Sequence, residues 1–367
     1  MDLHSFRIIG SQLGMLLDGA RVEKIHSPLS SVYTFSIFSR GKKLRLVIRY
    51  ERRQPLLFFS NRKLENPQQP PAKAMLLRKY AGGRRIGHGK IDLANRALAF
   101  PIHSYAFDET PDGEKTVRYL ILDMVSGPDI VSALPEGFQQ PLVWPDFEIV
   151  DALCEPSAYR NNTEAVWQQF SVLSPLLRDS LSHMESMDGR ALLVDLESGE
   201  GDLFFYKDAD GRPAFYNAWP LPDAVLRKRG LVPCSIEDIL RSSANPLEGS
   251  FPGGLSQEEY LAFSSLLAVS IIDEARFFAD VSNLVRKEAL APEKKKEKKL
   301  ARLRAKLDQE ETRLTGMKDL RKKALMLQQV LWQYPSEARL ADIRVEEDGK
   351  TERVELNPLL SVRENMA

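Results

Sequence analysis

The side chains best suited to acid–base or metal chemistry are five histidines, and none of them lies in a sequence that such chemistry requires. They are His4, His26, His88, His103 and His183. No pair has the His-Glu-x-x-His spacing of a zinc hydrolase, and none belongs to a nucleophile-elbow pattern. The pair Gly82-Gly83 lacks the strand–turn–helix setting of a nucleotide-binding loop. We therefore expect no catalytic residues, no metal site and no cofactor.

The cysteines and the overall charge restrict the class of protein. Cys154 and Cys234 show no metal-ligand spacing, which argues against a zinc site or a disulfide scaffold and fits a reducing cytosol. The 367 residues carry 51 basic and 51 acidic side chains, so a nucleic-acid surface requires local segregation of charge. The sequence shows neither a membrane span nor a signal-peptide pattern. We expect a cytoplasmic protein with no membrane partner and no small-molecule substrate.

A proline-led basic segment between residues 66 and 85 is the clearest candidate for a binding surface. Pro70 and Pro71 suit an extended entry or a first helical turn, and a helix is predicted over residues 72–80. Three apolar side chains of this helix are expected to face the core, namely Met75, Leu76 and Tyr80. Four cations are candidate phosphate contacts, namely Arg78, Lys79, Arg84 and Arg85. A solvated basic face on a packing helix explains the charge pattern equally well.

A second basic segment lies on a long predicted helix. Residues 286–306 hold ten Lys or Arg against three Glu. The candidate phosphate contacts in it are Lys294, Lys295, Lys298 and Lys299. Apolar residues follow at near-heptad spacing, namely Leu300, Leu303, Leu307, Leu314 and Met317, with Glu310 at one inward position. This pattern predicts one arm of a coiled coil, and the surface of such an arm is more often solvated than bound to nucleic acid.

The order of the predicted elements indicates an α+β protein with three regions. Residues 1–147 begin with a helix over 3–17 and continue with short strands, which predicts a helix-flanked β domain. Residues 157–255 are predicted to form a small, mainly helical domain with one β-hairpin. Residues 256–367 are predicted to form the arm and a β-hairpin tip, and we expect the arm to be truncated before a returning arm.

Five stretches, in order along the whole chain, carry a family resemblance. They are Gly19-Ala20-Arg21-Val22-Glu23-Lys24-Ile25, then Asn66-Pro67-Gln68-Gln69-Pro70-Pro71 with Met75-Leu76-Leu77-Arg78-Lys79, Asp210-Gly211-Arg212-Pro213, Ser235-Ile236-Glu237-Asp238-Ile239-Leu240, and Val354-Glu355-Leu356-Asn357-Pro358-Leu359-Leu360-Ser361 with Glu364-Asn365. Together they resemble the NFACT family, the RqcH and NEMF group formerly described as fibronectin-binding protein A.

The resemblance implies a factor of ribosome-associated quality control. Such a factor binds a large ribosomal subunit that still holds a stalled peptidyl-tRNA, so the implied partners are the large subunit, its rRNA and tRNA. In bacteria the family supports alanine tailing, whose chemistry belongs to the ribosome, and the resemblance therefore implies no enzyme. The implied fold is a glycosylase-like β-rich N-terminal domain, a helix-hairpin-helix-like middle domain and a coiled-coil arm.

Two tRNA-contacting sites are implied by the same resemblance. The family's Asp-Arg pair falls on Asn95-Arg96, so the arginine is kept while the nearest acid is Asp92. A second acidic, apolar and methionine patch falls on Asp123-Met124, with the acid displaced by one position. The resemblance thus implies tRNA contacts from Asn95, Arg96, Asp123 and Met124.

Two other functions are weighed against this one. A glycosylase or lyase acting on DNA would share the implied N-terminal fold, but residue 2 is Asp rather than the N-terminal proline nucleophile of true glycosylases. An extracellular matrix-binding adhesin would require an export signal, which the sequence does not show. Both are less well supported than RNA binding.

Overall fold

The structure of the chain is a computed structural model that describes residues 1–103, 117–155, 166, 168–242, 254–347 and 350–366. Within these ranges it does not describe the side chains of residues 242, 283–295, 347 and 350. Two compact units, unit 1 (Met1–Val281) and unit 2 (Ser282–Ala367), make up the chain. Helices and antiparallel sheets are both present, which confirms the predicted α+β class.

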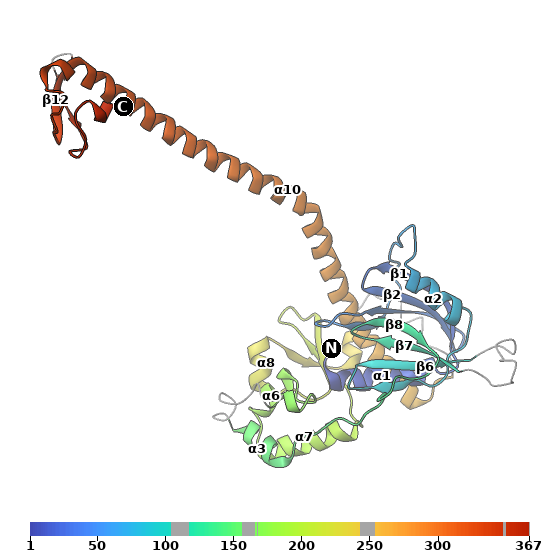
Figure 1. The fold of residues 1–367 in the computed structure, drawn as a ribbon. Helices are drawn as coiled ribbons and strands as arrows, with labels where there is room; N and C mark the ends of the chain where they lie inside the picture. Colours follow the sequence, from blue (N-terminus) through green and yellow to red (C-terminus); the bar gives the residue numbers. More distant parts are fainter. Residues whose placement is uncertain (104–116, 156–165, 167, 243–253, 348–349, 367) are drawn as a thin grey trace. The chain divides into compact units, whose positions relative to one another are not determined.

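Unit 1 begins with helix α1 (Leu3–Leu17), as predicted from the helical spacing of its apolar residues. The carboxylate of Asp2 accepts a hydrogen bond from the backbone N–H of His4 at 3.0 Å and so caps the helix. The ring of His4 lies 2.9 Å from the carbonyl oxygen of Val172, and burial lowers the pKa of His4. Helix α1 (dark blue in Figure 1) runs alongside the sheet that contains β6 and β7, within the main core.

Two antiparallel four-stranded sheets follow, and in each the strands lie in sequence order. The first contains β1 (Arg21–Leu29), β2 (Val32–Ser39), β3 (Lys42–Arg49) and β4 (Leu56–Phe59). The second contains β5 (Lys90–Asp92), β6 (Ala97–Ile102), β7 (Arg118–Asp123) and β8 (Gly127–Val131). Because side chains alternate across a strand, each sheet buries one row of apolar residues in the shared core.

Helix α2 (Ala72–Ala81) lies between the two sheets in the sequence and packs against β1 and β8. Its buried residues are Ala74, Leu77 and Ala81. Met75 and Leu76 are 51% and 40% exposed, so the prediction that they face the core is wrong. The two small alanines let the helix backbone approach the sheets closely, and this decides which face is buried.

The next part of unit 1 combines short helices with a three-stranded sheet. The helices are α3 (Phe147–Cys154), α6 (Pro175–Leu181), α7 (Ser186–Ser198), α8 (Asp223–Arg229) and α9 (Ile236–Ser242). The strands are β9 (Phe204–Lys207), β10 (Pro213–Asn217) and β11 (Val232–Cys234), in the order β10-β9-β11. The hydroxyl of Ser174 caps α6 by accepting from the N–H of Leu177 at 3.2 Å. Residues 164, 165 and 167 of a helix predicted over 164–170 lie outside the described residues.

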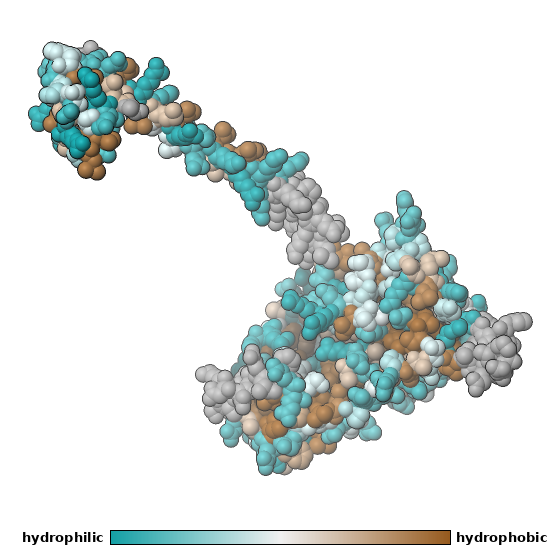
Figure 2. Space-filling view, viewed as in Figure 1, coloured by the Kyte–Doolittle hydropathy of each residue, from teal (hydrophilic) through white to brown (hydrophobic). Residues whose placement is uncertain are grey.

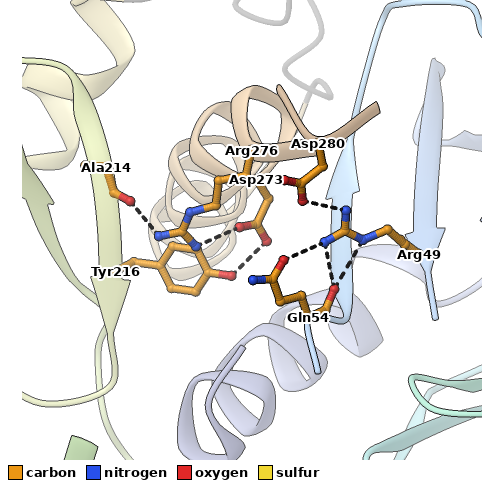
Figure 3. Close-up of polar contacts among 7 residues, drawn as sticks. All are labelled: Arg49, Gln54, Ala214, Tyr216, Asp273, Arg276 and Asp280. Atoms are coloured by element: carbon orange, nitrogen blue, oxygen red, sulfur yellow. Dashed lines mark hydrogen bonds and ion pairs between the residues drawn. The ribbon is translucent and has the colours of Figure 1, made fainter. Parts of the chain in front are cut away.

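The first part of the long helix α10 (Gln257–Val330) connects β10 with β3 inside unit 1, as Figure 3 shows. Asp273 is fully buried and accepts a hydrogen bond from the hydroxyl of Tyr216 at 2.8 Å. The guanidinium of Arg276 lies 3.4 Å from the same carboxylate. A few residues along α10, Asp280 accepts a hydrogen bond from Arg49 at 2.8 Å. Burial raises the pKa of Asp273 above its ordinary value, and it raises the pKa of Tyr216 well above its ordinary value.

Unit 2 contains the remainder of α10 and a small tip. The tip consists of a hairpin, β12 (Asp342–Glu347) with β13 (Lys350–Glu355), and two short 3-10 helices, η3 (Leu331–Gln333) and η4 (Glu364–Met366). The hairpin packs on α10 through a core of Met326, Leu327, Ile343, Val345 and Val354. In the described part of unit 2 no second long helix lies beside α10, so the coiled coil stays a prediction. The predicted divisions at residues 147, 157 and 255 also stay predictions.

Candidate nucleic-acid interface

The turn between β5 and β6 holds Asn95 and Arg96 in a fixed geometry. Asp92, which is buried, accepts hydrogen bonds from the backbone N–H and the side-chain amide of Asn95 at 3.2 and 2.8 Å. Arg96 has a φ of 52°, a left-handed conformation that is strained for any residue other than glycine. Its carbonyl accepts a hydrogen bond from the N–H of Met124 at 3.1 Å, which ties this turn to the neighbouring one.

The neighbouring turn joins β7 to β8 and is organised by Asp123. The carboxylate of Asp123 accepts hydrogen bonds from the backbone N–H groups of Val125 and Ser126, at 2.7 and 2.9 Å, and from the Ser126 hydroxyl. Gly127 ends the turn with a φ of 89°, and a Cβ at this position would lie 2.9 Å from the Tyr50 ring. A glycine is therefore required there. In the register of the sheet, Asp123 faces Ala97, so the two turns lie side by side.

A cavity of about 730 Å³ opens beside these two turns. Its apolar lining includes Ala97, Ile121, Val131 and Phe138, and its polar lining includes Arg52, Asn95, Arg96, Asp123 and Asp129. Ala97 and Ile121 point away from the main core, in which their neighbours Leu98, Leu120 and Leu122 are buried. The cavity therefore lies on the outer face of the second sheet.

Among the described residues, the carboxylates around the cavity have partners, whereas two of the arginines have none. Asp92 and Asp123 receive the hydrogen bonds described above, and Asp129 lies 3.6 Å from the ammonium group of Lys73. The guanidinium groups of Arg52 and Arg96 have no hydrogen-bond or ion-pair partner among the described residues. Each arginine carries a full positive charge and five hydrogen-bond donors. The two guanidinium groups can therefore bind an anion in the cavity.

The structure thus brings together three of the four residues to which the resemblance assigned tRNA contacts. Asn95, Arg96 and Asp123 line the cavity. Met124 is fully buried in the main core, so its side chain supports the turn from below instead of facing the cavity. Sequence reasoning missed Arg52, which follows β3 and is adjacent to the cavity only through the fold. No local pattern in the sequence could have indicated this position.

The four basic residues of the proline-led segment are only partly free to bind a ligand. Arg78 donates a hydrogen bond to the carbonyl oxygen of Ile25 at 2.7 Å, and Arg85 donates to that of Gly19 at 2.8 Å. Arg84 also has a partner within the described part of the chain. Lys79 lies 5.1 Å from the centre of the Tyr80 ring, a cation–π contact that leaves its ammonium group exposed.

The fold adds further cations to this surface. Arg21 on β1 is paired with Arg85 in an isolated antiparallel bridge, and both side chains are exposed. Arg118 lies 4.5 Å from the centre of the same Tyr80 ring that Lys79 contacts. Like charges placed opposite each other destabilise a sheet, so an anion between Arg21 and Arg85 would relieve their repulsion. The nearby His26 has a pKa lowered by burial and by Arg78.

The candidate lysines of the arm belong to unit 2. Lys298 and Lys299 are exposed, whereas the side chains of Lys294 and Lys295 lie outside the described residues. Over the part of the chain that the structure describes, no group of His, Cys, Asp or Glu side chains is arranged to hold a metal ion. Among the described helices, none is both long and apolar enough to cross a membrane.

Comparison with known proteins finds a family model and a relative that resemble part of the chain. Residues 2–125 match the model of the NFACT N-terminal and middle domains. The chain is 29% identical over 233 residues to the protein of Bacillus subtilis strain 168 described as the Rqc2 homolog RqcH. That match covers 59% of this chain and 38% of the relative, so the chain spans well under half of the relative's length.

Two solved structures have similar folds over part of the chain. One is the N-terminal part of the fibronectin/fibrinogen-binding protein of Streptococcus suis, with 17% identity, a TM-score of 0.41, and coverage of 61% of this chain and 91% of that one. The other is the fibrinogen binding protein of Staphylococcus aureus, with 17% identity, a TM-score of 0.40, and coverage of 65% and 96%. Likenesses this weak carry no argument about binding. The family model and the relative together support membership of the NFACT family.

Proposed function

We propose that the chain is an RNA-binding factor of ribosome-associated quality control, which binds large ribosomal subunits that hold a stalled tRNA. The observation that carries the proposal is the cavity beside the turns at Arg96 and Asp123, where two arginines have no partner among the described residues. Membership of the NFACT family supports the class of function. The tRNA is proposed to bind at this cavity.

The lining of the cavity suits an unpaired nucleotide of the tRNA. Phe138, Ile121 and Val131 offer an apolar surface against which the face of a base can stack. Arg52 and Arg96 lie on the polar side, where a guanidinium can bind a phosphate through two parallel hydrogen bonds. Phosphate contacts of this kind position an RNA without reading its sequence.

A second contact is proposed at the exposed basic surface formed by Arg21, Lys79, Arg85 and Arg118. Arg21, Lys79 and Arg85 are exposed and Arg118 is half-buried, and together they offer a path for an RNA backbone next to α2. Lys298 and Lys299 of the arm are proposed as separate contacts to rRNA, and Lys294 and Lys295 are included from the sequence pattern alone. Each neutralised phosphate releases counterions, so binding should weaken steeply as salt rises.

The proposed role is binding and positioning, and any peptide-bond chemistry is assigned to the ribosome. The acid of the family's Asp-Arg pair is replaced here by Asn95, and the nearby carboxylate of Asp92 is engaged with that residue. The competing proposal of a lyase needs a nucleophilic amine near the N-terminus, whereas Asp2 serves as the cap of α1. We therefore favour RNA binding by the described residues over catalysis.

The test is a tRNA-binding titration of two variants, in which Arg96 or Arg52 is replaced by alanine. Arg96→Ala should weaken binding about tenfold, because a charge-assisted hydrogen bond contributes about 1.5 kcal/mol. Arg52→Ala should have a similar effect. Arg53→Ala is the matched control, since Arg53 is exposed next to Arg52 but does not line the cavity. Equal affinities for the Arg96→Ala and Arg53→Ala variants would exclude the cavity as the tRNA site.

A further inference from the structure

The connection between β3 and β4 carries Arg52 to the edge of the cavity. It begins after Arg49, the last residue of β3, which is paired in the sheet with Leu56, the first residue of β4. Residues 51–54 of this connection are exposed, and they are called the loop here. The side chain of Arg52 lines the cavity. The position of one of the two cavity arginines therefore depends on how the loop is held.

Arg49 lies on the outer face of the first sheet, away from the main core. Because side chains alternate along a strand, Arg49 shares this face with Val47, whereas Ile48 is buried in the main core. Phe58 on β4 is paired with Val47 and packs against Phe277 of α10, with the two ring centres 5.6 Å apart. The first part of α10 therefore runs over the outer face of the sheet, next to Arg49.

The guanidinium of Arg49 joins α10 to the loop, as Figure 3 shows. One of its amino groups donates a hydrogen bond to the carboxylate of Asp280 at 2.8 Å. Its Nε and its other amino group both donate to the backbone carbonyl oxygen of Gln54, at 3.2 and 2.9 Å. Arg49 is buried, so water competes little with these charge-assisted hydrogen bonds. The far end of the loop is thus tied to α10 through one side chain.

The near end of the loop is tied to a turn that borders the cavity. The backbone N–H of Glu51 donates a hydrogen bond to the carbonyl oxygen of Met124 at 3.0 Å. Met124 follows β7 in the turn that Asp123 organises. Arg52 thus stands between two fixed points, one at Met124 and the other at Gln54.

We propose that Arg49 and Asp280 are positioning residues for the cavity, which hold the loop so that the guanidinium of Arg52 faces the anion before it binds. The proposal rests on the cavity as the tRNA site and adds a contribution from α10 to it. An arginine on a loose loop loses conformational freedom when it binds a phosphate, whereas an arginine on a held loop has already lost it. The contact between Asp280 and Arg49 therefore raises the affinity of a cavity that neither residue lines.

A role in fastening α10 to the first sheet explains only part of this geometry. The helix is already held there by Phe277 against Phe58, and by the backbone N–H of Phe59, which donates to the Ser270 hydroxyl at 2.9 Å. Arg49 directs two of its nitrogens to the loop and one to the helix. The loop therefore depends on Arg49 more than the helix does.

The first test measures the tRNA affinity of the 367-residue chain with the substitution Arg49→Lys. Lysine keeps the charge, but its single ammonium group cannot replace the fork that reaches Asp280 and Gln54 together. Binding should weaken about two- to tenfold, the cost of ordering one loose, rotamer-rich side chain. Because the net charge is unchanged, long-range electrostatics cannot cause such a loss. Unchanged affinity would overturn the proposal.

A second variant, Asp280→Asn, removes the same contact from the side of α10. The Asp280 side chain is 41% exposed, so asparagine can be solvated there and the fold is kept. Loss of an acid by itself strengthens binding to RNA, whereas loss of the positioning contact should weaken it. Glu258→Gln is the matched control, because it removes an exposed acid of the same helix that does not line the cavity. Asp280→Asn binding as tightly as Glu258→Gln would contradict the proposal.

Combination with the cavity variants distinguishes positioning from a general loss of structure. In a chain that already carries Arg52→Ala, the substitution Arg49→Lys should cause no further loss of affinity, because it acts through the Arg52 side chain. In a chain that carries Arg96→Ala, it should cause its full loss. Equal losses in the two backgrounds would refute the positioning role.

A measurement without RNA separates the held loop from the tRNA site. Trypsin cleaves after arginine, and Arg52 and Arg53 are exposed in the loop, so cleavage there reports how readily the loop opens. Mass spectrometry should show cleavage at these sites to be several times faster in Asp280→Asn than in Glu258→Gln, and equal rates would refute the held loop. If Arg52→Ala bound tRNA normally, the cavity would fail as the tRNA site, and the positioning role would fail with it.

Discussion

At the scale of single residues, Arg96 combines a strained backbone with a side chain that has no partner among the residues that the structure describes. Its φ of 52° is uncommon for a residue with a Cβ, and the turn is held by Asp92 below it and by Met124 beside it. Strained residues that surrounding contacts hold in place are concentrated at functional sites. The geometry of the turn and the free guanidinium both mark this residue as the centre of the cavity.

The strain and the charge of Arg96 can be separated by one substitution. Arg96→Gly should keep or raise the free energy of unfolding, by about 1 kcal/mol at most, because glycine adopts a positive φ without strain. The same variant should bind tRNA as poorly as Arg96→Ala, because both lack the guanidinium. Urea unfolding and a tRNA titration measure the two effects.

The control for this variant is Ala94→Gly in the same turn, where φ is not positive. It should lower the free energy of unfolding by about 0.5–1 kcal/mol, because glycine increases the freedom of the unfolded chain. If Arg96→Gly lost as much stability as Ala94→Gly, strain at Arg96 would be refuted.

At the scale of elements, the sequence predicted helices and strands whose apolar residues recur with a regular local spacing. Helix α1 begins at Leu3 and ends at Leu17 as expected, and short strands follow it, as predicted. The apolar face of α2 was predicted wrongly, because large apolar residues were taken for the buried ones while Ala74 and Ala81 make the close contacts. Helix α7, with its short stretches of polar residues, and strand β11 were not predicted.

The candidate site was predictable only where the family resemblance assigned its residues. Asn95, Arg96 and Asp123 were assigned through the family resemblance, and they line the cavity. Arg52 approaches the cavity from a segment about forty residues before Asn95, and Phe138 from the segment that follows β8, so both depend on the fold. Long-range pairing of this kind leaves no local pattern in a single sequence.

The buried cluster on α10 yields a prediction at this scale (Figure 3). Asp273→Ala should lower the free energy of unfolding by about 3 kcal/mol, because it removes the acceptor of the Tyr216 hydroxyl and the carboxylate that pairs with Arg276. Asp210→Ala, which removes a carboxylate from an exposed pair with Arg212, should give no measurable change. Denaturant unfolding of both variants measures this, and equal stabilities would show that the cluster does not hold α10 in unit 1.

At the scale of the whole molecule, the two units are assigned different kinds of contact. Unit 1 holds the cavity and the exposed basic surface beside α2, both proposed to bind RNA. Unit 2 holds the arm, whose lysines are proposed to contact rRNA and whose apolar residues lie at the surface between the grey segment of the arm and the tip in Figure 2. The net charge of zero is consistent with this, because the cations are concentrated locally and are balanced by acids elsewhere.

The central claim is that tRNA on a large ribosomal subunit contacts the cavity of unit 1, and photo-crosslinking tests it most directly. Stalled subunits carrying a tRNA with a photoreactive base would be mixed with the chain and irradiated, and the crosslinked peptides identified by mass spectrometry. We predict crosslinks in the segments that line the cavity, residues 92–97 and 121–138, and their loss in the Arg96→Ala variant. Crosslinks confined to other segments, with the same yield in that variant, would contradict the account.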